Sequence, residues 1–462
     1  MYFKNLNKII LNKKKTIRDI LKNFNTNAKL TDGKGFAIIV DDQGKICGVL
    51  TDGDLRNLIV KNKSLEQPVE NFLKNDYVFV RENENLHQII RKFDKGIKHI
   101  PIVDLKDKPI DLIIYSNFNF NSKINKKTIK VRAPHRISFS GGGFDFTNNF
   151  ENLNSLVLST TINSFCTTSI TLRSDKKIFI FSRDLNKKYN CENISKIKYN
   201  NNLDVIKAAV KLMKPSFGFN LETYSDINSG TGLGGSSALA VSVIAALNYF
   251  RNDHKMNLYQ IADMAYKAER IELSILGGWQ DQYASTFGGF NLIEFEKKSI
   301  LVNSLNIDKG TILELENNLL FFKIGSSRNS SKIQKKITRI NFNEIKKYNI
   351  EMNNLTLEMK KNLQHGNLTN FGKLLDQTWQ LKKQLNRSVS NKRIDKYYND
   401  IKKLGAYGGK LLGAGSSGYL MIYSEVKFQN QIIKYFKKIN VEKHRFNFTY
   451  DGLEEWSTEL VK

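Results

Sequence analysis

The amino-acid sequence predicts a chain of mixed α and β structure in two parts. A small α/β unit comes first, and a larger α+β body with two lobes follows. One observation behind this prediction is an internal repeat of helix, strand, turn, strand and helix within residues 1–118. Another is the alternation of β-branched strands, glycine turns and helices from residue 129 onward. The third is length, because 462 residues exceed what one ordinary hydrophobic core organises.

Loop-forming segments and composition set the expected domain boundaries and exclude some classes of protein. We expect the small unit at 1–118, a polar linker at 119–128, and two lobes at 129–305 and 306–462. The sequence has no run of about 18 apolar residues, so we expect no membrane span. Three scattered cysteines suit a cytoplasmic protein. The net charge of +27 is spread along the chain, which argues against a dedicated nucleic-acid surface.

The two copies of the repeat predict matching elements. The first copy predicts helices at 16–24 and 51–60 and strands at 36–40 and 46–50, and the second predicts a helix at 86–93 and strands at 100–103 and 110–115. The stretch from Gly48 to Arg56 and the stretch from His99 to Asp104 resemble a pair of CBS domains. This resemblance implies an adenine-nucleotide site at Thr51 and Asp54 and a homo-oligomer through the pair. The second copy lacks the Thr-x-x-Asp pattern, so the resemblance supports a site in the first copy only. The alternative is a structural or dimerising pair that binds nothing.

A glycine-rich loop at residues 228–239 is the strongest chemical signal of the larger body. Four glycines and two serines precede an apolar run that we expect to be helical from Ala238. Such a loop lets the backbone approach a ligand closely, and the N-terminus of the following helix favours an anion such as a polyphosphate. The loop lacks the Gly-Lys-Ser/Thr end of a Walker P-loop, so any phosphate contact must come from backbone N–H groups. The alternative is a flexible turn that caps a core helix.

Three further segments accompany this loop in a fixed order. They are Arg132-Ala-Pro-His-Arg-Ile-Ser-Phe-Ser-Gly-Gly-Gly-Phe-Asp145, the stretch 277–290 around Trp279-Gln-Asp281, and a glycine-rich turn at 405–418 followed by a strand at 419–423. We also expect a strand at 129–139 broken at Pro134 and a helix at 258–275. Together the four motifs resemble the GHMP kinase family over residues 129–462, and most of all its D-glycero-D-manno-heptose 7-phosphate kinase branch.

The resemblance assigns roles to particular residues. It implies Asp281 as the catalytic base beside Arg136, and Ser237 with Glu269 as ligands of Mg²⁺. It implies that ATP is bound by the loop residues Gly230, Gly232, Leu233, Gly234, Gly235, Ser236 and Ser237. The structural alternatives are that Asp281 caps a turn, that Arg136 forms an ion pair without a catalytic role, and that Glu269 is a solvated partner of Arg270 or Lys267.

The substrate side of the predicted site rests on another set of residues. The resemblance places Asp145 on sugar hydroxyls, and Gly413 and Gly415 close to the substrate or the nucleotide loop. Gly142 and Gly143 stand where galactokinase-like members carry a Glu-His pair, so we expect open space and less negative charge for a larger or phosphorylated sugar. Candidate cations for a distal phosphate are Arg173, Arg183, Arg328 and Lys410. Trp279 replaces a residue that is often lysine in the heptose kinase branch.

The sequence thus predicts an ATP-dependent sugar kinase of two-lobed GHMP type behind a CBS pair. The expected reaction phosphorylates the anomeric hydroxyl of a heptose 7-phosphate. The alternatives are a fucose- or galactose-type sugar 1-kinase, a GHMP-fold lyase or inactive regulator, and a CBS-regulated protein that only binds.

Overall fold

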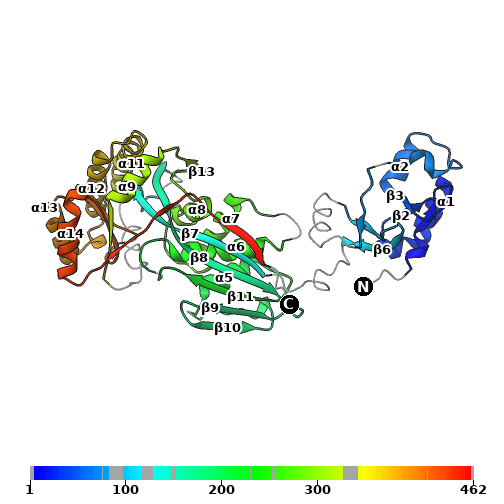
Figure 1. Cartoon of the computed structure of the whole chain (residues 1–462), viewed down its shortest axis with the longest axis horizontal. Helices are drawn as coiled ribbons and strands as arrows, with labels where there is room; N and C mark the ends of the chain where they lie inside the picture. Colours follow the sequence, from blue (N-terminus) through cyan, green and yellow to red (C-terminus); the bar gives the residue numbers. More distant parts are fainter. Residues whose placement is uncertain are drawn as a thin grey trace. The chain divides into compact units, whose positions relative to one another are not determined.

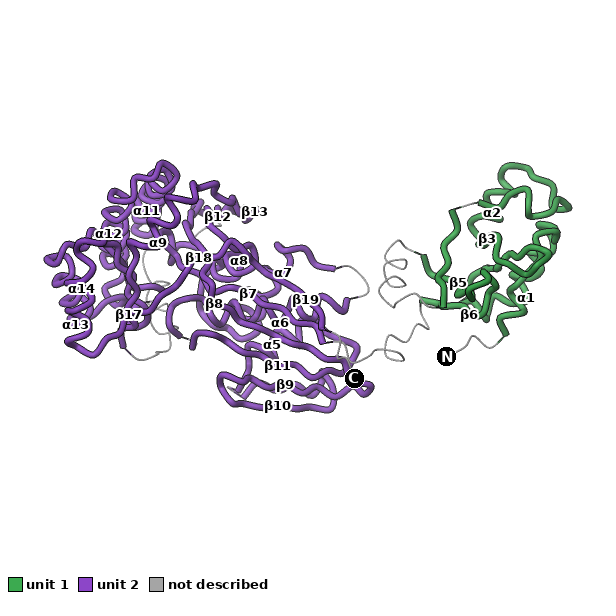
Figure 2. The backbone as a smooth tube through the Cα atoms, viewed as in Figure 1, with its two compact units in different colours: residues 1–124 green, residues 125–462 purple. Residues whose placement is uncertain are grey.

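The computed structural model describes residues 5–74, 76–82, 97–115, 128–146, 152–200, 202–228, 230–251, 255–325, 342–413 and 415–458. The chain forms two compact units, Met1–Ile124 and Asn125–Lys462 (Figures 1 and 2). In the described part of the chain, none of the helices is long and apolar enough to cross a membrane.

The first unit consists of two small sheets with the same topology. One contains β1 (Ile10–Asn12), β2 (Phe36–Val40) and β3 (Ile46–Thr51), and the other contains β4 (Val80–Arg81), β5 (His99–Val103) and β6 (Pro109–Ile114). In each sheet a parallel pair leads into an antiparallel hairpin whose register shifts at the end of the middle strand. The predicted internal repeat is therefore confirmed, although the helix expected at 86–93 lies outside the described residues.

The helices of the first copy begin as the sequence predicts. α1 (Ile17–Asn27) starts after a capping box formed by Thr16 and Asp19, and α2 (Asp52–Val60) starts after one formed by Thr51 and Asp54. One hydrophobic core joins the two copies, because Phe36 and Ile38 of the first sheet pack with Val103 and Leu112 of the second.

The second unit is built on a nine-stranded sheet. Its strands are β7 (Thr128–Ser140), β8 (Ser155–Leu172), β9 (Ile178–Ser182), β10 (Lys187–Cys191), β11 (Phe219–Ser225), β12 (Asn291–Glu296), β13 (Ser299–Ser304), β18 (Phe448–Thr449) and β19 (Glu454–Thr458). The helices α5 (Asp204–Met213), α6 (Gly235–Asn248), α7 (Leu258–Tyr266) and α8 (Gln280–Phe287) lie along this sheet (Figure 1). α6 is apolar almost all round because the sheet and the neighbouring helices bury it.

A second sheet of four strands carries the C-terminal helices. Its strands are β14 (Leu319–Ile324), β15 (Gly408–Leu411), β16 (Gly418–Tyr423) and β17 (Lys443–His444), and its helices are α9 (Lys309–Asn318), α11 (Phe342–Gln364), α12 (Leu368–Leu385), α13 (Lys392–Lys403) and α14 (Val426–Lys438). A shared core joins the two sheets. In it the Phe139 ring of β7 meets the Phe371 ring of α12 edge to face, with centroids 5.2 Å apart.

Four sequence expectations for this unit need correction. β7 is not broken at Pro134 but continues to Ser140, and the missing N–H is accommodated by a register shift between Pro134 and His135. α6 begins at Gly235, three residues before the expected start at Ala238, and Gly234 rather than a serine occupies the N-cap.

The remaining two corrections concern a helix and a turn. The helix expected at 258–275 ends as an α-helix at Tyr266 and continues as a π-helix over Lys267–Glu272. The glycine-rich stretch 405–418 contains β15, so it is not one turn. Glycines are required in that strand because side chains at Gly408 and Gly409 would overlap the backbone of Gly372 and of Met421.

Candidate active site

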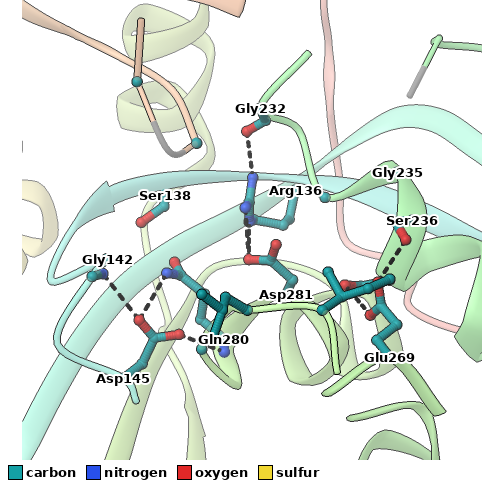
Figure 3. A pocket seen from close by; sticks show the side chains of 18 of the residues that line it. Arg136, Ser138, Gly142, Asp145, Gly232, Gly235, Ser236, Glu269, Gln280 and Asp281 are labelled. Carbon is teal, nitrogen blue, oxygen red and sulfur yellow. Dashed lines mark hydrogen bonds and ion pairs between the residues drawn. The ribbon is translucent and has the colours of Figure 1, made fainter. Parts of the chain in front are cut away.

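One pocket of the second unit gathers the predicted site residues (Figure 3). It is lined by Arg136, Gly142, Gly143, Asp145, Gly230, Gly232, Gly234, Gly235, Ser236, Ser237, Glu269, Asp281, Gly413 and Gly415. Leu233 does not line it, because its side chain is fully buried in the core while its carbonyl accepts the backbone N–H of Arg136 at 3.0 Å. β7, the glycine loop, α6, the π-helix and α8 thus converge on one cavity.

Arg136 links two of these segments. Its Nε and Nη2 donate to Oδ1 of Asp281 at 2.8 and 2.6 Å, and its Nη1 donates to the carbonyl oxygen of Gly232 at 2.7 Å. The Arg136 side chain is 4% exposed and that of Asp281 is 20% exposed. Both arginine bonds fall on the same carboxylate oxygen, so Asp281 is oriented toward the pocket instead of capping a turn (Figure 3).

The glycine loop rests directly on the 412–418 segment. Gly232 has φ +86°, and a Cβ there would overlap the carbonyl oxygen of Leu412. A Cβ on Gly413 would in turn overlap Cα of Gly232. Because α6 starts at Gly235, its unpaired N–H groups and the positive end of its dipole lie at the pocket.

Glu269 is held by hydroxyl and amide groups rather than by solvent. It is 1% exposed, so it is not the solvated group of the alternative, although Arg270 Nη1 pairs with its Oε1 at 3.8 Å. Its two oxygens accept hydrogen bonds of 2.6 Å from Ser236 and Ser237, and Gln282 Nε2 donates at 2.6 Å. The π-helix turns Glu269 toward these groups, and such π-turns often occur at functional sites.

The Ser237 and Glu269 oxygens fit a small divalent cation. Mg²⁺ is bound in proteins by one or two side-chain oxygens and completes its shell with waters and phosphate oxygens. Ser237 Oγ and Glu269 Oε2, 2.6 Å apart beside the start of α6, offer such a pair. Over the described ranges no group of three or more His, Cys, Asp or Glu side chains is placed to hold a metal, so a cation here would depend on the phosphate ligand.

Asp145 is buried under the segment that precedes α8. Its carboxylate accepts the backbone N–H of Gln280 at 2.9 Å and that of Gly143 at 3.0 Å, and Gln280 Nε2 lies 3.2 Å away. Complete burial raises the pKa of Asp145, although the backbone N–H of Gln280 acts in the opposite direction. Asp145 therefore fixes the backbone next to Asp281 as well as lining the pocket.

The expected open space at the two glycines exists at only one of them. Gly143 has φ +105°, and no atom of the described residues lies within 4 Å of its Cβ position, so this side is open to them. At Gly142 a Cβ would lie 2.8 Å from Gln280 Nε2, so that space is already filled. The sequence could not reveal this, because Gln280 comes from a segment 138 positions away and was not singled out.

Two lysines of the C-terminal part line the pocket. Lys410 of β15 was among the candidate cations, whereas Lys382 of α12 was not. Arg173 and Arg183 do not line it. They are ion-paired with Asp175 and Glu222 on the nine-stranded sheet, and Arg328 lies outside the described residues. Lys382 gave no sequence signal because it precedes Lys383 in an ordinary amphipathic helix. Trp279 stacks on Tyr266 with ring centroids 3.4 Å apart.

The fold and this constellation are those of a phosphotransferase that acts on an alcohol group. The family models of the GHMP kinases match at residues 204–289 for the N-terminal domain and 359–438 for the C-terminal domain, and the CBS domain model matches at 7–61 and 69–117. The chain belongs to the GHMP kinase family and carries N-terminal CBS domains.

Several relatives narrow the class to sugar kinases. The D-glycero-alpha-D-manno-heptose 7-phosphate kinase of Campylobacter jejuni is 32% identical over 337 residues, which cover 71% of this chain and 99% of that enzyme. The L-fucokinase/L-fucose-1-P guanylyltransferase of Bacteroides fragilis is 30% identical over 47% of this chain and 24% of its own length. In fold, a D-glycero-D-manno-heptose 1-phosphate kinase from Bacteroides thetaiotaomicron matches with TM-score 0.59 at 24% identity, over 71% of this chain and 98% of that one.

The charge on Lys382 predicts a pH dependence of stability. Burial first, and then the positive charge of Arg136, lower its pKa from 10.5 to about 8. Between these two values the unfolded chain binds a proton that the folded chain does not, so raising the pH favours folding. We expect the wild-type unfolding midpoint to rise relative to that of Lys382→Met as the pH rises from 8 to 10.5. Thermal unfolding at a series of pH values measures this difference.

Lys373→Met is the matched control, because Lys373 lies on the exposed face of the same helix. It should follow the wild type at every pH. A Lys382→Met protein with the same pH dependence as the wild type would contradict the lowered pKa.

Proposed function

We propose that this sugar kinase transfers the γ-phosphoryl group of ATP to the anomeric hydroxyl of D-glycero-D-manno-heptose 7-phosphate, giving the 1,7-bisphosphate and ADP for nucleotide-activated heptose. The observation that carries the proposal is the Arg136–Asp281 pair beneath the glycine loop. In one pocket the chain thus has a carboxylate, a buried arginine and the N-terminus of a helix, the groups that the proposed reaction needs. The similarity to a heptose 7-phosphate kinase supports the choice of sugar.

Asp281 and Arg136 have separate roles in this mechanism. The anomeric oxygen forms a bond to the γ-phosphorus while the bond from that phosphorus to the β,γ-bridging oxygen breaks and ADP leaves. Asp281 accepts the hydroxyl proton late in the transfer. Arg136 keeps the carboxylate in position and offsets negative charge on the transferring group. Ser237 and Glu269 would hold Mg²⁺, which neutralises phosphate charge.

A second hollow is a candidate site for the adenine base. It shares Gly235 and Ser236 with the main pocket and is lined by apolar side chains, among them Leu185, Leu203 and Leu239. A flat base in this hollow would leave its phosphates beside the glycine loop. This position supports ATP as the phosphoryl donor.

A substrate screen tests the proposal against its nearest rivals. With Mg-ATP we expect kcat/KM for the heptose 7-phosphate to exceed that for fucose, galactose and other free hexoses by at least about 100-fold, since a site built for phosphate loses charged hydrogen bonds without it. Coupled detection of ADP measures the rates. A preference for fucose, as the Bacteroides fragilis relative suggests, would replace the proposed substrate.

Replacing the proposed base tests the mechanism. Asp281→Asn keeps the size of the side chain and an oxygen for Arg136 but removes the proton acceptor, so kcat should fall by about 10²- to 10⁴-fold. KM for ATP should change little. Asp308→Asn, at the exposed N-cap of α9, is the control and should retain the wild-type rate. A wild-type rate for Asp281→Asn would exclude Asp281 as the base.

We further propose that the CBS pair binds an adenine nucleotide at Thr51 and Asp54, regulates the kinase and mediates homo-oligomer formation. Asp54 Oδ2 accepts the Thr51 hydroxyl at 2.6 Å, and Oδ1 pairs with Lys74 at 2.8 Å. These contacts also suit a purely structural helix cap, which is the alternative. A nucleotide would have to compete with them for Asp54.

Titration of AMP into the full chain distinguishes the two roles. Asp54→Asn should weaken AMP binding by about 10-fold or more if the carboxylate accepts hydrogen bonds from the nucleotide. Asp42→Asn, which removes a carboxylate from an exposed turn of the same unit, should leave AMP affinity unchanged. Equal AMP affinity in Asp54→Asn and wild type would favour the structural role.

A further inference from the structure

Lys382 and Lys410 form a cationic pair at one end of the pocket. Lys410 is 4% exposed and donates to the carbonyl oxygen of Phe139 at 3.1 Å, and Lys382 donates to that of Gly413 at 2.8 Å. Burial is the main cause that lowers the pKa of both lysines. The charge of Lys382 and then that of Arg136 lower the pKa of Lys410 further, and the charge of Arg136 also lowers the pKa of Lys382. In the part of the chain that the structure describes, neither lysine has an ion pair with a carboxylate.

Lys410 lies farther along β7 than the Arg136–Asp281 pair, whereas Lys382 lies beside Gly413, which packs on Gly232 next to Arg136. Phe139, which holds Lys410, is three residues beyond Arg136, or roughly 10 Å along a strand. Glu269 and Ser236 lie on the opposite side of the Arg136–Asp281 pair from Ser138 and Gly142 (Figure 3). Lys410, which is held by the neighbour of Ser138, therefore lies on the side of Ser138 and Gly142.

Two buried polar atoms lie on the Gly142 side of the pocket. Among the described residues, Ser138 Oγ and Gln280 Oε1 have no hydrogen-bond partner, and the two residues are 6% and 8% exposed. Both line the pocket and lie 3.0 and 3.2 Å from the Cβ position of Gly142, so they approach the same point. Buried polar atoms are normally paired, which indicates that a polar ligand group satisfies them.

The charge of the two lysines also indicates a bound ligand, in this case an anion. The ammonium form of each lysine is disfavoured by burial because its partner is only a carbonyl oxygen, and a bound anion would stabilise that form. The reacting phosphoryl group already has Arg136, the start of α6 and the Ser237–Glu269 pair. A second phosphate at the far end of the same sugar would compensate the remaining cations through charge-assisted hydrogen bonds.

We infer that Lys382 and Lys410 bind the substrate phosphate that is not transferred, while Ser138 and Gln280 bind sugar hydroxyls between the two ends. The inference rests on the proposed function and deepens it. Along β7 the pocket is then ordered as phosphoryl transfer at Arg136, hydroxyl recognition at Ser138 and distal phosphate binding at Lys410.

Steady-state kinetics with D-glycero-D-manno-heptose 7-phosphate and the unphosphorylated heptose test this order. Lys382→Met should raise KM for the phosphorylated sugar by about 10- to 100-fold and leave its kcat within about threefold, because one charged hydrogen bond is lost in both ground and transition states. Its kcat/KM for the free heptose should stay within about threefold. Lys410→Gln, which can still donate to Phe139, should act in the same direction, and Lys373→Met should match the wild type.

The outcomes separate failure of this site from failure of the proposed substrate. If the wild type handles both sugars equally, the proposed substrate is wrong and the distal phosphate site is lost with it. If the wild type prefers the phosphorylated sugar and Lys382→Met keeps that preference, only the lysine site is wrong. A fall in kcat that is equal for both sugars would assign the lysines to the transferring phosphoryl group and overturn the inference. Unchanged ATP affinity in the variants confirms that they fold.

Discussion

The guanidinium group of Arg136 is the contact on which the site depends. It bonds the Asp281 carboxylate twice and the Gly232 carbonyl once, and so joins β7, α8 and the glycine loop, which are far apart in the sequence. At 4% exposure the charge is shielded from water, which strengthens each of these bonds. Gly232 in turn rests on the backbone of Gly413. One side chain thus sets the geometry of three of the four glycine-rich segments.

Three acidic side chains share the pocket, and each has a different kind of partner. Asp281 is bonded by the Arg136 guanidinium, Glu269 by hydroxyl and amide donors with Arg270 3.8 Å away, and Asp145 mostly by backbone N–H groups in a buried position. A carboxylate beside a cation can take a proton only when substrate chemistry supplies it, whereas one held by hydroxyls can exchange them for a metal ion. The roles proposed for the three acids therefore rest on their different partners and not on the acids themselves.

Local sequence patterns predicted most of the fold but only part of the site. Apolar runs correctly predicted β2 and β5, the Thr-Asp-Gly-Asp start correctly predicted α2, and the order of the glycine motifs identified the family. Contacts across the fold were not predictable, because they depend on residues that look ordinary in isolation. Lys382 has the pattern of a solvated helix lysine, Gln280 fills the space expected beside Gly142, and the tight packing of Gly408 against α12 resembled a turn.

The backbone contact between Gly232 and Gly413 has a consequence for how the two substrates bind. No side chain separates the nucleotide loop from the C-terminal segment, so a displacement of one backbone must displace the other. The carbonyl oxygen of Gly413 also accepts a hydrogen bond from the ammonium group of Lys382. If a nucleotide binds the loop as proposed and shifts it, the proposed sugar side of the pocket moves with it. By thermodynamic linkage the sugar would then change the affinity for nucleotide by the same factor, so the contact between two glycines would couple the two ligands.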